Sequence, residues 1–488
     1  MERGVINRLS SGIQGLDELL HGGYIAERMY LVLGGPGTGK TLLGGSFLAD
    51  GLDRGENVLV INGEESREEL LVNAARVGGD LGDADFLDLG PDSGFFSEER
   101  AYQVVTPRDI SGDRLVEAIR EAIEEFDPRR VLIDPISQLK SIEPTEYQYR
   151  KRIISFMRFL RERGTTVLVT QTPAGEHSDL KSLSDGIIRL RYSENGRRIG
   201  IRKHRAESTP DGSHGMQIRD DGIDVFPSLV PASHDREFEP KQISSGIDGL
   251  DTLIGGGLER GTVTIISGPT GIGKSTTATE FLETAASEGV SGLIYLFEEN
   301  DDTFVHRSEA LGIPVTELQE RNLLTVEEVE PLAMSPEEFA QQVRTNVEQR
   351  NVEFVVIDGT DGYKQSLHGE RANTTRRLHA LTRYLRNMNV SVILTDEISQ
   401  VTGLAQPTSE NISYLGDNII FMNYIERDGH IERVVGMLKK RVGKFEDTLR
   451  LFTFTDDGIE VGSPMTDVRG ILEGTPELIE EPPSRHAD

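Results

Sequence analysis

The sequence predicts an α/β protein built from two tandem domains, each with a mainly parallel β-sheet flanked by helices. Three observations support this fold class. Apolar, β-branched runs alternate with helical stretches, which is typical of parallel sheets buried on both faces. The chain of 488 residues is long enough for two or three domains with full hydrophobic cores. The same order of runs and loops occurs twice, with a glycine-rich loop in each copy.

The first glycine-rich loop has the pattern G-x-x-x-x-G-K-T at residues 34–41. It follows the apolar run 29–33, which suits a buried strand, and precedes residues 42–51, which suit a helix. Strand, glycine loop and helix together are the context of a phosphate-binding loop. Glycines let backbone N–H groups surround phosphate oxygens, and the helix N-terminus adds partial positive charge. A nucleotide-binding site is therefore predicted here.

A second loop of this kind occupies residues 268–275 and follows the strand-like run 263–266. In each loop the lysine is expected to reach the β- and γ-phosphates, and the hydroxyl residue after it to ligate Mg²⁺. The predicted nucleotide-binding residues are Gly35, Pro36, Gly37, Thr38, Gly39, Lys40, Thr41 and Leu42 in the first copy and Gly268, Pro269, Thr270, Gly271, Ile272, Gly273, Lys274, Ser275 and Thr276 in the second.

The repeat extends well beyond the loops. The pattern S-S-G-I-x-G-L-D begins at residue 10 and again at residue 244, and the two loops begin at residues 34 and 268, so both offsets are 234 residues. A repeat this long indicates whole domains rather than a solenoid. The C-terminal tail, residues 463–488, is either a solvated end or a peptide that docks a partner. The expected boundaries are a first domain at 1–226, an exposed linker at 227–240, a second domain at 241–462 and a flexible acidic tail at 463–488.

Carboxylates follow several of the predicted strands, and ligands of parallel α/β sheets bind at the carboxyl ends of the strands. Asp134 and Asp358 each end an apolar run. Either residue suits a helix cap as well as a Mg²⁺ ligand, and the glycine loop in the same copy favours the metal. The predicted metal ligands are therefore Thr41, Asp134, Ser275 and Asp358. The further strands are expected at 58–61, 131–133 and 167–169 in the first copy and at 293–296, 354–357 and 390–394 in the second.

A glutamate pair follows the first strand after each loop. The pairs are Glu64–Glu65 and Glu298–Glu299, again 234 residues apart. Hydrolysis needs a carboxylate that orients and deprotonates water in line with the γ-phosphate, and a second carboxylate could support it. In a chain this acidic the alternative is an ordinary acidic loop, but the shared offset favours the catalytic interpretation.

Two further features leave alternatives open. A third strand ends in Thr170–Gln171 in the first copy and at residues 395–397 in the second, where a polar side chain can sense the γ-phosphate. Basic clusters stand at residues 202–205 and 439–441. Each cluster is either a surface strand that balances local acid or a mobile cation delivered to a phosphate of a neighbouring subunit.

Composition excludes several classes of protein. There is no cysteine, so disulfides and thiolate chemistry are ruled out. The ten histidines show no paired metal-ligand spacing and are expected at the surface or in caps. The net charge of −30 repels nucleic acid at low salt, yet it also suits a protein of a salt-rich cytoplasm. We expect no membrane span, no signal peptide and a cytoplasmic location.

Together these motifs resemble the KaiC and RecA-like ATPase family, in particular its double-domain KaiC-like members from archaea and bacteria. The resemblance covers residues 5–462. It implies a RecA-type fold in each copy, ATP as the nucleotide with Mg²⁺, and a hexameric double ring with ATP between subunits. It assigns water activation to the glutamate pairs Glu64, Glu65, Glu298 and Glu299. It also makes four basic residues trans-acting contacts to ATP on the adjacent protomer, namely Lys203, Arg205, Lys439 and Arg441.

In clock KaiC the second domain also phosphorylates itself on a Ser-Thr pair just before a terminal strand. The matching segment here is residues 411–417. Ser413 matches the serine, whereas Tyr414 and Gly416 stand where threonines would be. The resemblance thus implies Ser413 as a phospho-acceptor and argues against an ordered two-site cycle.

The leading functional hypothesis is an ATPase that switches conformation within a ring and signals to protein partners, with serine autophosphorylation as a branch. The competing class is a DNA-dependent recombination or repair ATPase, because the same core serves that function. The sequence shows no basic stripe, 6% aromatic residues and no tryptophan, which argues against nucleic acid as the partner. Stimulation of the ATPase by DNA would decide between the two.

Overall fold

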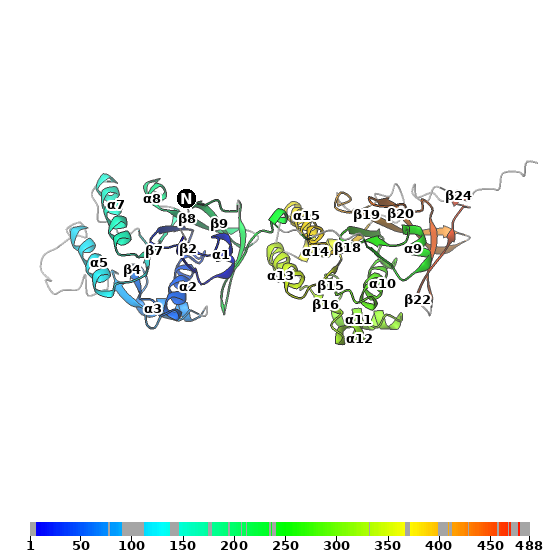
Figure 1. Ribbon diagram of the computed structural model, residues 1–488, viewed down its shortest axis with the longest axis horizontal. Coiled ribbons are helices and arrows are strands. Elements are labelled where there is room, and N and C mark those ends of the chain that lie inside the picture. The colour runs from blue at the N-terminus through cyan, green and yellow to red at the C-terminus, as the bar shows by residue number, and fades with distance from the viewer. Residues whose placement is uncertain are drawn as a thin grey trace, which may run out of the picture. The chain divides into compact units, whose positions relative to one another are not determined.

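The computed structural model contains two compact units, Met1–Ser228 and Leu229–Asp488, each of which is described by itself (Figure 1). Their boundary falls within the residues expected to form a linker. The structure describes residues 6–76, 79–89, 112–136, 146–173, 178–193, 196–205, 207–210, 212–233, 236, 241–330, 332–366, 371–398, 408, 412–427, 429–455, 458–466, 468–469 and 477–478.

The first unit is organised around a nine-stranded sheet with the strand order β11-β10-β9-β8-β3-β7-β6-β4-β5. The six strands β8, β3, β7, β6, β4 and β5 run parallel to one another. Strands β9, β10 and β11 extend the sheet beyond β8, and each is antiparallel to its neighbour. The strands are β3 Met29–Leu33, β4 Val58–Asn62, β5 Asp85–Asp88, β6 Arg130–Asp134, β7 Thr166–Gln171, β8 Gly186–Ser193, β9 Gly196–His204, β10 His214–Arg219 and β11 Gly222–Phe226.

Helices cover both faces of this sheet, and a small two-stranded sheet pairs β1 with β2. The other elements described in the first unit are β1 Arg8–Leu9, β2 Tyr24–Ile25, α1 Gln14–Leu19, α2 Lys40–Asp53, α3 Arg67–Ala75, α5 Gly112–Phe126, α7 Glu146–Glu162 and α8 Ser178–Leu183.

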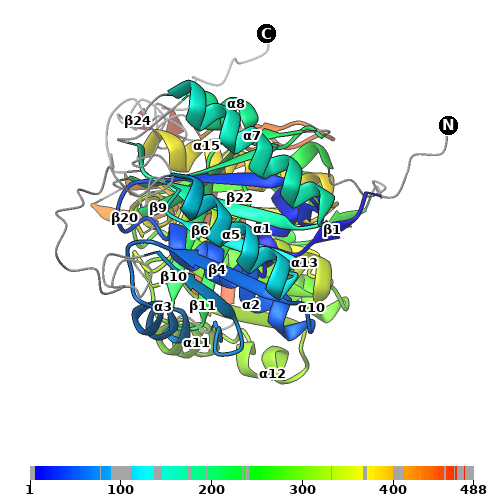
Figure 2. The same ribbon diagram turned by 90° about the vertical axis from the view of Figure 1, so that its left-hand side faces the viewer.

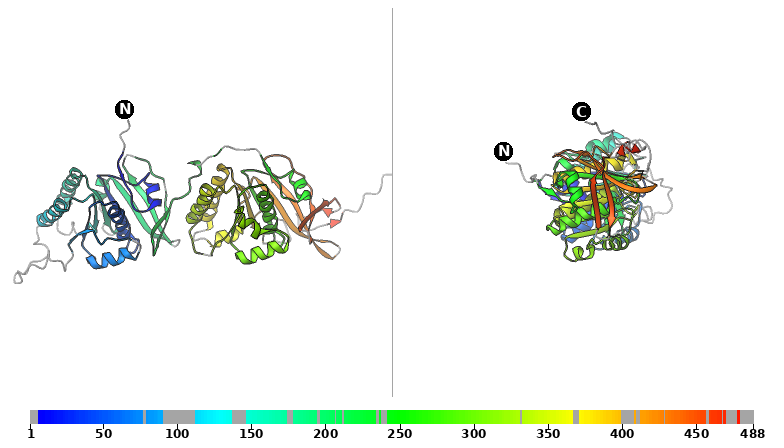
Figure 3. Two further views of the ribbon diagram at one scale, coloured as in Figure 1. Left: turned by 60° about the horizontal axis from the view of Figure 1, so that its bottom comes forward. Right: turned by 90° about the vertical axis from the view of Figure 1, so that its right-hand side faces the viewer.

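The second unit repeats this topology with the order β16-β15-β17-β18-β14-β19-β20-β21-β22. Its strands from β16 to β19 in this order are parallel, and β20 to β22 are antiparallel (orange in Figure 3). The strands are β14 Val263–Gly268, β15 Gly292–Leu296, β16 Leu324–Glu328, β17 Phe354–Asp358, β18 Ser391–Glu397, β19 Asn418–Arg427, β20 His430–Lys440, β21 Arg450–Thr455 and β22 Gly458–Pro464.

The remaining elements of the second unit are helices and two small paired sheets, β12 with β13 and β23 with β24. They are η2 Pro231–Ser233, β12 Gln242–Ile243, α9 Asp248–Ile254, β13 Leu258–Glu259, α10 Lys274–Ser287, α11 Asp301–Ala310, α12 Val315–Glu320, α13 Pro336–Gln349, α14 Thr360–Ser366, α15 Arg371–Asn387, β23 Val468–Arg469 and β24 Glu477–Leu478.

The central strand β3 shows why its sequence is apolar throughout. Successive side chains of a strand point to opposite faces of the sheet. Met29, Leu31 and Leu33 pack with residues of α5 and α7, whereas Tyr30 and Val32 pack with residues of α1 and α2. Figure 2 shows α5 and α7 lying across one face of this sheet. The strand is therefore buried on both faces, as expected for a parallel sheet between helix layers.

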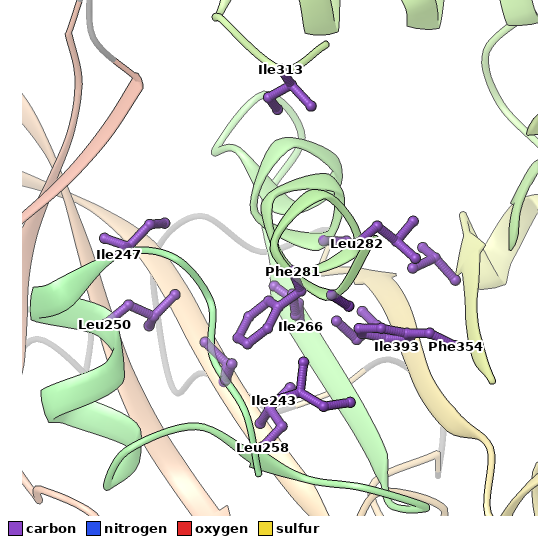
Figure 4. Close-up of a cluster of buried hydrophobic side chains, with 14 of the residues drawn as sticks. Ile243, Ile247, Leu250, Leu258, Ile266, Phe281, Leu282, Ile313, Phe354 and Ile393 are labelled. Atoms are coloured by element: carbon purple, nitrogen blue, oxygen red, sulfur yellow. The ribbon is translucent and has the colours of Figure 1, made fainter. Parts of the chain in front are cut away.

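The core of the second unit is assembled in the same way. Ile266 of β14 packs on Phe281 and Leu282 of α10, in one cluster with Ile393 of β18 and Phe354 of β17 (Figure 4). Phe281 and Leu282 are fully buried. Burying one such side chain contributes roughly 1.5–3 kcal/mol relative to leaving it exposed. The packing fixes α10 against the sheet, and with it the glycine loop that begins the helix.

The predicted fold class is confirmed in both units, and every predicted strand lies in a strand of the structure apart from Val390, which precedes β18. The expectation that every histidine lies at the surface or in a cap was wrong. His204 and His214 are 8% and 1% exposed. Both lie in antiparallel strands of the first sheet, where one face is covered by α1 and α2, and periodicity alone does not reveal this burial.

Parts of the expected linker and tail have structure of their own. In the expected linker, the Asn387 side chain donates a hydrogen bond to the Pro231 carbonyl at 2.8 Å, so this part of the linker contacts α15. The described tail residues include the end of β22 and the pair β23–β24. The other residues of these two segments lie outside the described part of the chain. Within the described residues, no helix has the length and apolar character needed to cross a membrane.

Candidate nucleotide-binding sites

Each glycine loop lies where the sequence predicts it, between a central parallel strand and a helix. Gly39 and Gly273 precede α2 and α10 with φ of 96° and 115°, a left-handed conformation that favours glycine. A Cβ at Gly273 would also lie 2.6 Å from Cζ of Phe454. Both conformation and space therefore require glycine at this turn, which leads the loop into the helix N-terminus.

The predicted carboxylates gather at the carboxyl edge of each sheet because the strands that carry them are parallel. In the first sheet Asn62 pairs with Asp134, and Glu64 and Glu65 follow Asn62 after one glycine. In the second sheet Leu296 pairs with Asp358, and Glu298 and Glu299 follow. The glycine loops leave the same edge, so lysine, hydroxyl, aspartate and glutamates of one copy converge on one site.

In the second unit two oxygen donors suited to Mg²⁺ are in direct contact. The Ser275 hydroxyl donates a hydrogen bond to Oδ1 of Asp358 at 2.9 Å. Thr395 donates to the same oxygen at 2.6 Å, so the carboxylate is held in place. Burial raises the pKa of Asp358, and these two hydrogen bonds oppose the rise. A hydroxyl and one carboxylate, completed by phosphate oxygens and water, are the ligands that Mg²⁺ takes in nucleotide sites.

The first unit holds its aspartate in a related way. The Thr170 hydroxyl donates a hydrogen bond to Oδ1 of Asp134, as Thr395 does to Asp358. Thr170 of β7 and Thr395 of β18 thus orient the aspartate that is the predicted metal ligand of the same unit. The next residue along each strand, Gln171 or Asp396, is buried. Within the described residues, no group of three or more His, Asp and Glu side chains is placed to hold a metal ion alone.

The two loop lysines fold back onto their own loops. Nζ of Lys274 donates to the carbonyls of Gly268 and Pro269, both at 2.9 Å, and Nζ of Lys40 donates to the carbonyl of Gly35 at 3.0 Å. Burial lowers the pKa of both lysines, and nearby carboxylates oppose this effect. The two ammonium groups therefore lie at the loop, close to the acidic edge of the sheet.

The glutamate pairs differ in their partners. In the second unit Glu298 accepts a hydrogen bond from the Gly362 backbone N–H at 3.2 Å, and burial raises its pKa. Its neighbour Glu299 accepts two hydrogen bonds from Arg307, at 3.2 and 2.8 Å. In the first unit the Asn73 amide donates to Glu65 at 3.3 Å. The pair in the second unit thus contains one ion-paired glutamate and one without an ion pair in the described structure.

Arg307 is a site residue that the sequence interpretation missed. It lies on α11, eight residues after Glu299, and Asn73 is eight residues after Glu65. Aligning the two copies at their 234-residue offset would have shown that a neutral amide in one copy is a guanidinium in the other. The difference is visible only when corresponding positions of the two copies are compared.

In each unit the basic cluster lies at the end of the sheet where the central strand begins. The glycine loop lies at the other end, where that strand stops. In the first sheet Tyr30, near the start of β3, pairs with Gly186, and Gly186 pairs with His204. Lys203 and Arg205 flank His204, so they stand beside the beginning of β3. Four residues of strand, about 13 Å, separate Tyr30 from the loop at the other edge.

The second unit shows the same arrangement. Thr264 of β14 pairs with Asn418, which pairs with Lys440, so Lys439 and Arg441 stand beside the beginning of β14. Arg441 forms an ion pair with Asp417 at 2.8 Å, and in the first unit Arg205 contacts Asp185 at 3.3 Å. The arginine side chains are 53% and 50% exposed respectively. The two arginines thus balance local acid and remain accessible.

The predicted phospho-acceptor lies beside the second basic cluster. Nζ of Lys439 donates to the carbonyls of Ser413 and Gly416, at 3.3 and 2.5 Å. Ser413 is partly exposed. Tyr414 is 52% exposed, with its ring edge-on to His379. Asn411, the first residue of the matched segment, lies outside the described residues.

Comparison with known proteins agrees with this geometry. The family model described as "ATPase: KaiC" matches the chain twice, at residues 9–230 and 243–466. The circadian clock oscillator protein KaiC of Synechococcus elongatus is 26% identical, over 98% of this chain and 93% of its own. KaiC of Acaryochloris marina is 25% identical over 96% and 91%. The circadian clock protein KaiC3 of Synechocystis is 25% identical over 96% and 95%.

Two matches to the family model together cover most of the chain, and each includes one complete glycine loop with its aspartate and glutamate pair. The relatives align over nearly their full length. The chain therefore belongs to the KaiC ATPase family.

Proposed function

We propose that this protein is an ATP-hydrolysing regulatory switch that works as a homo-oligomeric ring. The resemblance to the KaiC family suggests that the ring is a hexamer. The observation that carries the proposal is the gathering of a loop lysine, a hydroxyl, an aspartate and a glutamate pair at one sheet edge in each unit. Both sites have the complete set, so both are expected to bind Mg²⁺-ATP and hydrolyse it.

In this mechanism the loop lysines exchange their carbonyl hydrogen bonds for phosphate oxygens. Ser275 with Asp358, and Thr41 with Asp134, would hold Mg²⁺. When bound, the ion offsets the negative charge that the β- and γ-phosphates carry. Glu298 would take a proton from the attacking water, and burial raises the pKa of its carboxyl group, which makes it a stronger base. Glu64 has the corresponding place in the first unit.

The position of the basic clusters supports sites that are completed by a second subunit. The basic residues of each unit lie at the end of the sheet opposite to their own glycine loop, so they do not reach the nucleotide bound there. These residues are Lys203, Arg205, Lys439 and Arg441. A heterologous interface, in which one edge of a subunit meets the opposite edge of the next, would bring them to a neighbouring phosphate. Such an interface closes into a ring when its rotation permits, and it makes hydrolysis depend on assembly.

Subunit mixing tests this trans arrangement. One variant carries Lys40→Ala and Lys274→Ala, and the other carries Arg205→Ala and Arg441→Ala. We expect each variant alone to lose activity by about tenfold or more, because one half of every site is damaged. Mixed rings should recover roughly a quarter of wild-type turnover, because that share of interfaces joins an intact loop to intact basic residues. Mixed oligomers without recovery would show that the basic clusters do not act in trans.

Ser413 is the proposed acceptor of an autokinase branch. It stands beside Lys439, at the edge that would face the neighbouring subunit's nucleotide. The γ-phosphoryl group would pass from ATP to the serine oxygen, with release of ADP and of the hydroxyl proton. Tyr414 is an exposed second hydroxyl next to it.

One experiment separates these functions. Phosphate release and protein-bound label are measured together on the full-length protein with Mg²⁺-ATP in high salt, with and without single-stranded DNA. We expect slow release that DNA does not change, because ring rearrangement can limit turnover. Label at Ser413 would support the autokinase branch, and release without label would remove it. Strong stimulation by DNA would instead favour the recombination or repair class.

A further inference from the structure

Arg307, on α11, contacts two other parts of the second site. Its guanidinium binds Glu299 through Nε at 3.2 Å and Nη2 at 2.8 Å, and its Nη1 donates to the Thr276 hydroxyl at 3.1 Å. Thr276 follows Ser275 in α10, the helix that begins at the glycine loop. The arginine therefore fastens the loop that carries the glutamate pair to the helix that carries the phosphate-binding residues.

The first unit lacks this connection. The position of Arg307 is taken by Asn73 and that of Thr276 by Leu42, at the same 234-residue offset. Asn73 and Leu42 instead line a cavity of about 20 Å³ between α2 and α3. The Glu65 carboxylate accepts one amide hydrogen bond, from Asn73 at 3.3 Å, and has no ion pair in the described part of this unit.

Charge explains why the second unit would need an arginine. Five carboxylates, those of Glu298, Glu299, Asp358, Asp396 and Glu397, lie at this sheet edge, and the nucleotide that must bind there is itself strongly negative. Unit charges of the same sign a few ångströms apart repel one another strongly at the effective dielectric of a protein surface. A bidentate guanidinium removes one such charge and also fixes the orientation of the carboxylate.

We propose that Arg307 is a positioning residue that neutralises Glu299 and ties it to α10, so that Glu298 alone of the pair acts on water in the second site. The inference rests on the proposed function. The first site has Asn73 at the position of Arg307, so no guanidinium from that position pairs with its glutamates. The two sites are thus built differently, although their loops and strands are the same.

The test measures ATP affinity, KM and kcat on the full-length protein with the first site silenced by Lys40→Ala. Affinity is measured with a slowly hydrolysed ATP analogue. Arg307→Asn copies the first unit, and Arg307→Asn with Glu299→Gln removes the charge that the arginine had balanced. Arg321→Asn is the matched control, because Arg321 is an exposed arginine of the same unit that pairs with Glu317.

Arg307→Asn is expected to weaken ATP binding about tenfold, since it leaves an unbalanced charge beside the phosphates. The double variant should return to within about threefold of the parent, and the control should not change. A double variant as weak as the single one would overturn the proposal, since it would mean that Arg307 binds the nucleotide itself or only supports the fold. An unchanged affinity in Arg307→Asn would also overturn it.

Arg307→Lys separates charge from geometry and covers the case in which Arg307→Asn does not fold. Lysine keeps the charge but cannot form the bidentate contact. We expect a KM close to that of the parent and a kcat lowered about tenfold, because Glu299 is no longer held. Equal losses in both parameters, or in neither, would contradict the positioning role. If the parent binds ATP without hydrolysing it, the proposed function fails for this unit, while the affinities still decide on the charge balance.

Discussion

The full-length protein with Glu64→Gln and Glu298→Gln is expected to retain ATP but to release phosphate at least about a hundredfold more slowly than the wild type. A positioned general base contributes typically 10²- to 10⁴-fold to a rate, and glutamine cannot accept the proton. The loop lysines and the metal ligands remain intact in this variant, so nucleotide binding should persist. Phosphate release and equilibrium ATP binding, measured on the same sample, check both halves of the expectation.

Two exposed glutamates provide the control, Glu68→Gln on α3 and Glu317→Gln on α12, which remove the same charges away from the sites. The single variants then show how turnover is divided between the units. Turnover that is unchanged in the Glu64→Gln/Glu298→Gln variant would refute the assignment of the base. Loss of ATP binding would show that these glutamates hold the nucleotide site together instead.

The variant Arg130→Ala is expected to destabilise the first unit by about 3–5 kcal/mol, the usual cost of breaking a buried ion pair. Arg130 is fully buried at the start of β6 and forms ion pairs with Glu56 at 2.6 Å and Asp50 at 2.9 Å. It also donates to the carbonyls of Ser10 and Phe47, at 3.0 and 2.6 Å. Alanine would leave a cavity and two carboxylates without this partner.

Arg129→Ala is a close control, because Arg129 contacts the same Glu56 but is 48% exposed. A surface pair of this kind is worth about 0–1 kcal/mol. Arg130→Met should cost less than Arg130→Ala, since it fills the space, and the second unit has Phe354 at the corresponding position. The chain has no tryptophan, so calorimetry or circular dichroism should follow unfolding. Equal losses in Arg129→Ala and Arg130→Ala would contradict this account of the buried cation.

Much of the fold could be predicted because its causes are local. Apolar runs such as 29–33 and 354–357 indicated strands buried on both faces, and the glycines at 39 and 273 allow the turn into the next helix. Parallel strands share an edge, so residues that follow them were expected to meet, and Asp134 and Asp358 do lie at that edge. The two copies also supported each other, since a chance match would not recur at a fixed offset.

Local patterns in the amino-acid sequence were enough to predict the repeat, the strands of each sheet and the residues of both candidate sites. Tertiary structure alone decided which charges are buried. Arg129 and Arg130 are equivalent in sequence, yet one is half exposed and the other is enclosed by Ser10, Phe47, Asp50 and Glu56 from other segments.

Tertiary structure also decided where the basic clusters stand. Their sequence leaves open whether they serve their own loop, whereas the antiparallel return of β9 and β20 carries them to the far edge of each sheet. It decided as well that Arg307 reaches both Glu299 and Thr276. The physical reason is common to these cases. Propensity and periodicity act over a few residues, whereas burial and ion pairing depend on which distant segments the folded chain brings together.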